Sequence, residues 1–260
     1  MSILRSAAPG LALALALAGL ALPALAQDKI VIGTEAAYPP FAYVLPSGEL
    51  EGFDISIAKA LCAQMQADCT IVNQAFDGLI PALNAKKIDA IIASMFVTEE
   101  RLKAIDFAGP YYSVPGVFVA PKDTELELTE DSLGRRVTIG VQRGTTFPNY
   151  LKANFPKARI QFYDTIDAAK LDLTSGRVDL VFADSVVLED FLKSKDGETF
   201  AVLGEPVYDA ELLGAGAGIG LRKGDTALKE KFDAALAALI ASGEYKKIND
   251  QFISVDIAPK

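Results

Sequence analysis

Histidine is absent from the 260-residue sequence. Its absence excludes Ser-His-Asp triads, Cys-His dyads and zinc sites that depend on imidazole ligands. Positive charge is also scarce, because 25 Lys and Arg residues face 34 Asp and Glu residues and leave a formal net charge of −9. This balance argues against a nucleic-acid partner and is compatible with a small cationic ligand. Hydrophobic residues make up 51% of the chain, enough for a sizeable core in one domain or in two small lobes.

The N-terminus has the features of a secretory signal peptide. Arg5 supplies a short positive region, residues 11–22 form a Leu- and Ala-rich apolar run, and an Ala-Leu-Ala cleavage motif ends at Ala26. A membrane anchor is the alternative, but the apolar run is short for a membrane span. No cysteine follows directly, which argues against a lipid anchor. We therefore expect export and removal of residues 1–26.

Cysteine occurs only twice, at Cys62 and Cys69. In an exported protein, an even and closely spaced pair suggests a disulfide. Two reduced cysteines buried in the core are the alternative that the residues alone leave open. A redox function would normally use a Cys-x-x-Cys motif, which the sequence lacks.

Residues 88–101 join a short apolar run, typical of a buried strand, to a Thr-Glu-Glu helix start at Thr98. Open α/β sheets bind small ligands where a strand ends and a helix begins. Free N–H groups there favour anions, and Arg101, one helical turn past Thr98, suits a carboxylate. Taken alone, the stretch is equally compatible with a surface turn and a solvated arginine.

The two halves of the chain repeat one pattern of strands and helices. Ser94 lies five residues past Asp89, and Asp184 lies five residues past Asp179. Ordinary α/β periodicity would give alternation without matching strand ends. We therefore expect two related β-α-β-α-β lobes, with Ser94 and Asp184 facing each other across the cleft between them.

Proline, glycine and helix-capping residues predict the remaining organisation. Residues 111–121 and 205–213 have the pattern of crossovers between lobes. Apolar spacing predicts a helix over residues 53–65, and Asp77 and Thr226 are the expected N-caps of two later helices.

Six motifs together resemble the periplasmic amino-acid-binding proteins of ABC transporters, solute-binding protein family 3. The resemblance covers residues 28–255 and is strongest to the lysine/arginine/ornithine- and histidine-binding group. The motifs are IGTEAAYPPF at 32–41, GFDI at 52–55, FDGLIPAL at 76–83, KIDAII at 87–92, TEER at 98–101 and GIGLRK at 218–223.

The resemblance implies an α/β, two-lobed periplasmic-binding-protein fold. Each lobe is expected to be a mainly parallel sheet flanked by helices, and two hinge crossovers join the lobes. Residues 27–113 and 210–260 would form lobe 1, and residues 114–209 lobe 2. The family also implies a periplasmic monomer that delivers an amino acid to membrane permease subunits of an ABC importer, with no cofactor or metal. Its disulfide lies where this chain has its cysteine pair.

Family members also imply a role for each site residue. Arg101 matches the arginine that binds the ligand α-carboxylate, and backbone N–H groups of Ser94 and Thr146 assist it. Asp184 matches the acid that binds the α-ammonium. Glu35 matches the acid that meets a cationic side-chain end. Two aromatic residues, Tyr38 and Phe76, match those that sandwich the ligand side chain.

Some positions depart from the group that binds lysine or arginine. Small polar residues are usual where this chain has Ala93 and Phe96. Ala-Ser-Met at 93–95 is similar to opine-binding relatives, but Phe96 would fill the room that a second carboxylate arm needs. The full predicted set of ligand-binding residues is Glu35, Tyr38, Phe76, Ala93, Ser94, Met95, Phe96, Arg101, Gln142, Thr145, Thr146 and Asp184.

The leading hypothesis is therefore a binding protein for arginine, lysine or ornithine, with histidine as a further candidate. An opine or an uncharged amino acid such as glutamine is the alternative ligand. A cyclohexadienyl-dehydratase-like enzyme uses the same fold, but the absence of histidine and of an evident nucleophile–base pair argues against catalysis. We expect no catalytic residues.

Overall fold

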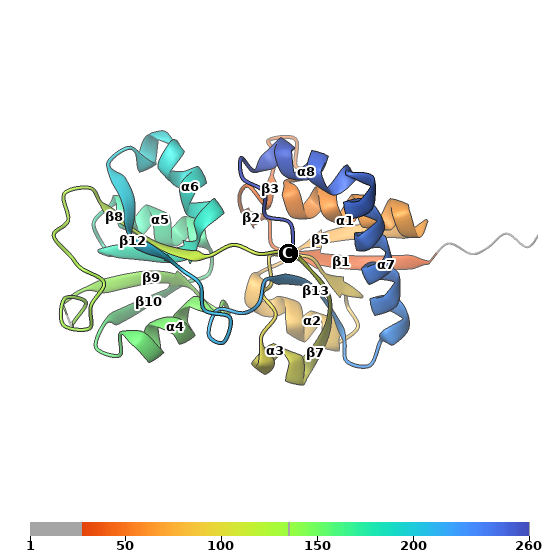
Figure 1. The fold of residues 1–260 in the computed structure, drawn as a ribbon, viewed down its shortest axis with the longest axis horizontal. Coiled ribbons are helices and arrows are strands. Elements are labelled where there is room, and N and C mark those ends of the chain that lie inside the picture. The colour runs from red at the N-terminus through yellow and green to blue at the C-terminus, as the bar shows by residue number, and fades with distance from the viewer. Residues whose placement is uncertain (1–27, 135, 260) are drawn as a thin grey trace, which may run out of the picture.

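The computed structural model describes residues 28–134 and 136–259, so the predicted signal peptide lies outside the described residues. Two lobes lie side by side, each with a five-stranded sheet (Figure 1). The predicted α/β class is confirmed. Below, lobe 1 is the part that contains β1 and lobe 2 the part that contains β9. No described helix is long and apolar enough to cross a membrane.

The sheet of lobe 1 has the order β5-β1-β6-β13-β7. β1 pairs in parallel with β5 and β6, whereas β13 runs antiparallel to β6 and β7. The strands are β1 (Lys29–Thr34), β5 (Asp68–Asn73), β6 (Ala90–Ile91), β7 (Ile105–Tyr112) and β13 (Ala217–Arg222).

Lobe 2 repeats this arrangement with the order β10-β9-β11-β8-β12. β9 pairs in parallel with β10 and β11, and β8 runs antiparallel to β11 and β12. Both sheets are thus mixed, with one strand running against the other four. The strands are β8 (Gly116–Pro121), β9 (Thr138–Gln142), β10 (Arg159–Tyr163), β11 (Leu180–Asp184) and β12 (Phe200–Val207).

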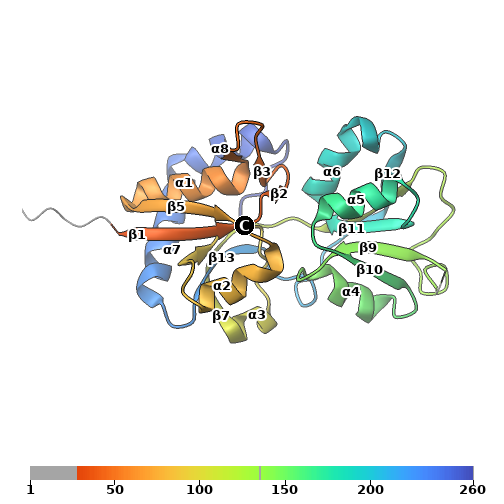
Figure 2. The same cartoon turned by 180° about the vertical axis from the view of Figure 1, so that it is seen from behind.

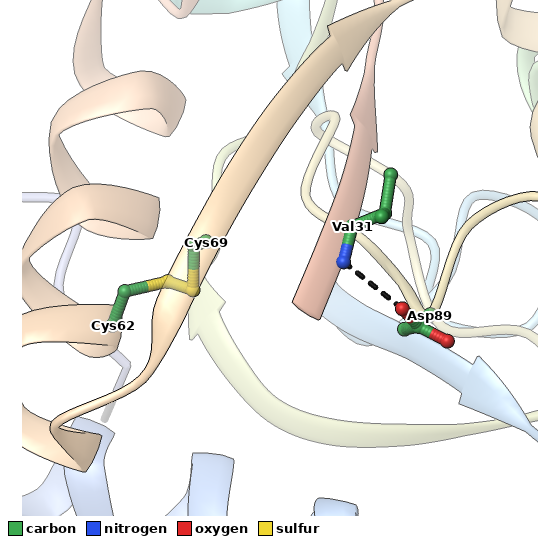
Figure 3. Close-up of a disulfide and its surroundings, with 4 residues drawn as sticks. All are labelled: Val31, Cys62, Cys69 and Asp89. Carbon is green, nitrogen blue, oxygen red and sulfur yellow. Dashed lines mark hydrogen bonds between the residues drawn. A yellow bond between two sulfur atoms is a disulfide. The ribbon is translucent and has the colours of Figure 1, made fainter. Parts of the chain in front are cut away.

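Each sheet has an aspartate at the equivalent position that connects two of its own strands. Asp89 accepts a hydrogen bond at 2.9 Å from the backbone N–H of Val31, beside β6 (Figure 3). Asp179 accepts one at 2.7 Å from the backbone N–H of Thr138, beside β11. A short strand such as β6 leaves neighbouring N–H groups without a strand partner, and the carboxylate supplies one. This matched contact supports the predicted relationship between the two halves.

Helices cover both faces of the lobe 1 sheet. α1 and α8 lie on one side of it, and α2 and α3 on the other (Figures 1 and 2). Buried apolar residues of α1 and α7 enter the main core, and those of α2 enter a second cluster. The helices are α1 (Phe53–Met65), α2 (Leu79–Asn84), α3 (Glu99–Ala104), α7 (Thr226–Ser242) and α8 (Glu244–Phe252), with a 3₁₀ turn η1 (Phe76–Gly78) and a small sheet of β2 (Ala37–Tyr38), β3 (Ala42–Val44) and β4 (Leu50–Glu51).

Lobe 2 has the same layering. α4 lies on one side of its sheet, and α5 and α6 lie on the other (Figures 1 and 2). Leu151 of α4 and Ile166 of α5 are fully buried in the core. The helices are α4 (Phe147–Asn154), α5 (Ile166–Thr174), α6 (Ser185–Lys193) and a 3₁₀ turn η2 (Lys195–Gly197).

The chain passes between the sheets at residues 113–115 and 208–216. The first predicted crossover, 111–121, is too wide, because residues 116–121 form the buried strand β8. The second, 205–213, begins and ends three residues early, because β12 continues to Val207 and β13 begins at Ala217. The C-terminal segment returns to the first crossover, where Ser113 donates a backbone hydrogen bond to Ile257 at 3.1 Å.

Two of the predicted N-caps are wrong by small shifts. Asp77 lies inside η1, and α2 begins after Gly78 without a side-chain cap. Asp225, and not Thr226, caps α7 by accepting a hydrogen bond from the N–H of Leu228 at 3.3 Å. Asp and Thr are both favourable N-cap residues, so the sequence alone does not distinguish Asp225 from Thr226 as the cap.

The predicted helix over residues 53–65 is confirmed as α1. Cys62 near its end is bonded to Cys69 on β5, so the predicted disulfide is confirmed (Figure 3). The bond ties a helix to the strand that follows it, at the edge of the lobe 1 sheet.

Candidate ligand-binding site

A cavity lies between the two lobes. Eleven of the twelve residues predicted from the sequence line it, and Phe147 is an additional lining residue. Lobe 1 contributes seven lining residues and lobe 2 contributes five. They are Glu35, Tyr38, Phe76, Ala93, Ser94, Phe96 and Arg101 from lobe 1, and Gln142, Thr145, Thr146, Phe147 and Asp184 from lobe 2.

Met95 is the exception, and its prediction as a ligand contact is corrected. Its side chain is 1% exposed and packs in the apolar cluster with Leu79 and Phe107. Phe147 was missed although it directly follows Thr146 at the start of α4. Its position at that strand-to-helix junction is the sequence feature that indicates a ligand contact.

The carboxyl ends of parallel strands place the acidic and amide groups of the cavity. Glu35 follows β1, Gln142 ends β9 and Asp184 ends β11. Strands that run in parallel deliver their last residues to the same edge of a sheet, where ligand sites of α/β proteins occur. Because the two sheets point these edges at each other, groups from both lobes meet in one cavity.

Arg101 enters the cavity from the first turn of α3. The N-cap Thr98 accepts a hydrogen bond from the Arg101 N–H at 3.2 Å, as predicted. The guanidinium donates to the carbonyl of Phe96 at 2.6 Å and, across the cleft, to the carbonyl of Gly144 at 2.9 Å. It also lies over the Phe76 ring, 5.6 Å from its centre. Burial lowers the pKa of Arg101 to about 10, so the group stays cationic at neutral pH.

Asp184 supplies the opposite charge from lobe 2. Its Oδ2 accepts a hydrogen bond from the Tyr38 hydroxyl at 2.6 Å across the cleft. Its Oδ1 is buried and has no hydrogen-bond partner among the described residues. Burial raises the pKa of Asp184 to about 7. A buried carboxylate oxygen without a donor is costly, so this side of the cavity favours a cationic donor.

Glu35 is the second buried acid of the cavity. Gln142 Nε2 donates to its two oxygens at 2.7 and 2.8 Å, and this contact joins the lobes. Burial raises the pKa of Glu35 to about 7, and the hydrogen bond from Gln142 opposes the rise. The carboxylate is therefore ready to ionise next to a cation.

Asp54 and Tyr111 are buried polar residues that reading the sequence missed as part of the site. The Tyr111 hydroxyl accepts a hydrogen bond from the Ser94 N–H at 3.0 Å. In this structure the Ser94 N–H thus has the Tyr111 hydroxyl as its acceptor, and its use for a ligand carboxylate stays a prediction. Among the described residues, no group of three His, Cys, Asp or Glu side chains is placed to hold a metal ion.

The sequence profile of the bacterial extracellular solute-binding proteins, family 3, matches residues 30–255. The chain belongs to this family. Among its relatives, the L-arginine-binding protein of Pseudomonas aeruginosa is 47% identical over 249 residues, covering 94% of this chain and 95% of that protein. ABC transporter arginine-binding protein 1 of Escherichia coli is 43% identical over 242 residues, covering 93% and 98%.

Solved structures of solute-binding proteins agree with this assignment. A periplasmic binding protein of Salmonella typhimurium, described as having high arginine specificity, has a TM-score of 0.80 at 34% identity and covers 86% of this chain and 99% of that one. An ancestral amino-acid-binding protein, a precursor of cyclohexadienyl dehydratase, has a TM-score of 0.77 at 29% identity and covers 86% and 95%. The predicted family and two-lobed fold are confirmed.

Proposed function

We propose that this solute-binding protein captures a cationic amino acid, with arginine as the leading candidate ahead of lysine, ornithine and histidine. The observation that carries the proposal is the charge pattern of the cavity. Arg101 lies on one wall, and the partnerless Oδ1 of Asp184 and the carboxylate of Glu35 are the acidic groups. A cationic amino acid carries one negative and two positive charges, which matches this set. The names of the arginine-binding relatives point to the same ligand class.

Each end of the ligand then has a partner of opposite charge. Arg101 binds the α-carboxylate through its guanidinium fork, and Asp184 binds the α-ammonium. Because these residues belong to different lobes, a ligand that bridges them stabilises the closed arrangement. Thr145 and Thr146 lie beside Arg101 in the cavity lining and add polar groups at the carboxylate end.

The side chain of the ligand lies between Tyr38 and Phe76, and its cationic end meets Glu35. Aromatic faces attract guanidinium and ammonium groups as well as alkyl chains. Micromolar affinity requires about −8 kcal/mol. Three ion pairs and two ring faces are a reasonable source of that free energy after the costs of binding are subtracted.

Several further properties belong to the same proposal. The signal peptide is cleaved after Ala26, and the mature protein is a periplasmic monomer that meets the permease subunits of an ABC importer. Lobe 1 comprises residues 27–113 and 210–260, and lobe 2 comprises residues 114–209. The protein is a carrier and not an enzyme.

Calorimetry of ligand-stripped protein against the twenty amino acids and ornithine tests the proposal. We expect saturable heat with arginine, and no heat with arginine, lysine, ornithine or histidine would contradict it. Glu35→Gln is the matched variant for the side-chain end. It should weaken arginine binding far more than glutamine binding, whereas equal weakening would remove Glu35 from side-chain recognition.

A further inference from the structure

We propose that Asp54 and Tyr111 are positioning residues for the amino-acid site, because they hold Ser94 of the cavity wall in a left-handed backbone conformation. The inference rests on the proposed function, since it concerns the same cavity. Neither residue lines that cavity. Their contribution is to the shape that the ligand meets.

Ser94 has an unusual backbone for its residue type. Its φ angle is +52°, a region that residues with a side chain rarely adopt and that glycine adopts freely. The residue is 8% exposed and lies in the cavity wall between Ala93 and Phe96. A conformation of this kind persists only where the surroundings determine it.

Three hydrogen bonds form a closed triangle around Ser94. Its N–H donates to the Tyr111 hydroxyl at 3.0 Å, and its own hydroxyl donates to Asp54 Oδ2 at 2.9 Å. The Tyr111 hydroxyl in turn donates to Asp54 Oδ1 at 2.8 Å. Both carboxylate oxygens of Asp54 and the Ser94 N–H are therefore satisfied within the triangle. Any backbone rotation that moved Ser94 out of its left-handed conformation would disturb two of these bonds.

The triangle stands on rigid elements of lobe 1. Asp54 lies in the first turn of α1 and is 1% exposed, and Tyr111 lies on β7 and is fully buried. Outside the triangle, the Tyr245 hydroxyl of α8 donates to the backbone carbonyl of Tyr111 at 2.7 Å. The orientation of the cavity wall is thus determined by a helix, a strand and a buried ionisable group at once.

The triangle affects the part of the cavity that binds the α-carboxylate of the ligand. Ser94 is seven residues before Arg101 on the same strand-to-helix segment, and Phe96 between them accepts a hydrogen bond from the Arg101 guanidinium. Releasing Ser94 shifts the wall that faces this end. Agmatine, which is arginine without its α-carboxylate, should depend less on the triangle than arginine does.

Tyr111→Phe is the principal test, because it deletes one hydroxyl from the triangle. We expect arginine affinity to fall about tenfold, because Ser94 is no longer held in its left-handed conformation, with a smaller loss for agmatine. Tyr245→Phe is the matched control. It deletes a hydroxyl that bonds to the Tyr111 carbonyl but not to Ser94, so it should lower the Tm while leaving arginine affinity within about twofold.

Asp54→Asn is a second variant, which tests the inference if the Tyr111→Phe protein does not fold. The substitution keeps the size of the buried side chain. It should also weaken arginine, and its effect should combine with that of Tyr111→Phe less than additively because both act through one network. Wild-type arginine affinity in the folded Asp54→Asn or Tyr111→Phe protein would overturn the inference. If the wild-type protein binds no cationic amino acid, the proposed function is contradicted and the inference is not. The affinity of the same variants would then be measured with the ligand that calorimetry identifies.

Discussion

Gln142 Nε2 of lobe 2 lies 2.7 and 2.8 Å from the two carboxylate oxygens of Glu35 in lobe 1. The same nitrogen donates to the backbone carbonyl of Asp164 at 3.1 Å. The amide therefore connects the lobes within the cavity, which Glu35 and Gln142 both line. Its donation stabilises the ionised form of an acid that burial would otherwise keep neutral.

Replacing Gln142 with leucine should raise the pKa of Glu35 above its present value of about 7. Less of the carboxylate is then ionised at pH 7, and arginine affinity should fall about tenfold, the scale of a lost hydrogen bond to a charged group. Titrations at pH 7 and pH 9 check this, because raising the pH restores the ionised acid and part of the affinity. Citrulline, the neutral analogue of arginine, is the control ligand, and an equal loss for both ligands would show that only the cavity shape had changed.

Ligand affinity should depend on pH around neutrality. Burial raises the pKa of Glu35 from 4.5 and of Asp184 from 3.8, each to about 7. Below pH 7 these acids are mostly protonated, and a cationic ligand must displace their protons. Arginine affinity should therefore fall by about tenfold per pH unit for each carboxylate as the pH drops from 7 to 5. Calorimetry in buffers of different ionisation heat should show proton release on binding, and a flat profile would contradict the assignment.

The stability of the ligand-free protein should change in the opposite direction. Between pH 4 and pH 7 the folded state holds protons on Glu35 and Asp184 that the unfolded chain has released. The free energy of unfolding should accordingly decrease as pH rises through this window and level off above it. Urea titrations at pH 5 and pH 8 measure the difference. Burial also raises the pKa of Asp54 to about 7, so this residue contributes in the same direction. Substituting Asp184→Asn should reduce the difference, because one of the three acids is then removed.

Positions at strand ends were predictable from the sequence, whereas contacts that depend on side-chain direction were not. Glu35 and Asp184 follow short apolar runs, and the parallel sheet brings such ends together for topological reasons. Met95 was misplaced because β6 pairs over only two residues, so no alternation shows which side chains face the cavity. Asp54 was read as a residue of a helix start, and its bond to Ser94 spans 40 positions of sequence. Only the packing of α1 against the sheet brings them together.

Phe96 should act as the residue that excludes larger ligands. It is 7% exposed, packs edge-on to Tyr112 with ring centres 6.0 Å apart, and contributes to the cavity wall. Phe96→Ala should open room for an opine such as octopine and raise its affinity, at a stability cost of about 3–5 kcal/mol. Phe147→Ala is the matched control, since Phe147 is 5% exposed and lines the cavity from lobe 2. Octopine binding that stays undetectable in the Phe96→Ala protein would remove this role.

The disulfide should stabilise lobe 1 without affecting the ligand. Cys62 and Cys69 are seven positions apart, and closing so short a loop contributes about 2–3 kcal/mol in the chain-entropy model. Neither cysteine lines the cavity. The Cys62→Ala/Cys69→Ala double variant should lose about that free energy of unfolding in urea while keeping wild-type arginine affinity. A parallel loss of affinity would indicate that the α1–β5 connection also shapes the site.

Gly144 should limit how closely the two lobes approach. Its φ is +74°, and a Cβ atom at this position would lie 3.1 Å from the Asp77 Cβ and 3.3 Å from its Cα in the opposite lobe. Gly144→Ala therefore combines two costs, the strain of a left-handed alanine and the separation of the lobes near Arg101, whose guanidinium bonds to the Gly144 carbonyl. Gly176→Ala is the matched control. Gly176 has a φ of +67° in lobe 2, but its added Cβ would have no neighbour within 4 Å.

The two alanine variants separate strain from lobe closure. Both should lose about 1 kcal/mol of stability from the backbone change alone. Only Gly144→Ala should lose arginine affinity, by about tenfold, because closure is what brings Arg101 and Asp184 to the same ligand. Small-angle X-ray scattering with saturating arginine should show a larger radius of gyration for Gly144→Ala than for Gly176→Ala. Equal affinities for the two variants would mean that the lobes tolerate the added methyl group, and that the contact at Gly144 does not set the closed state.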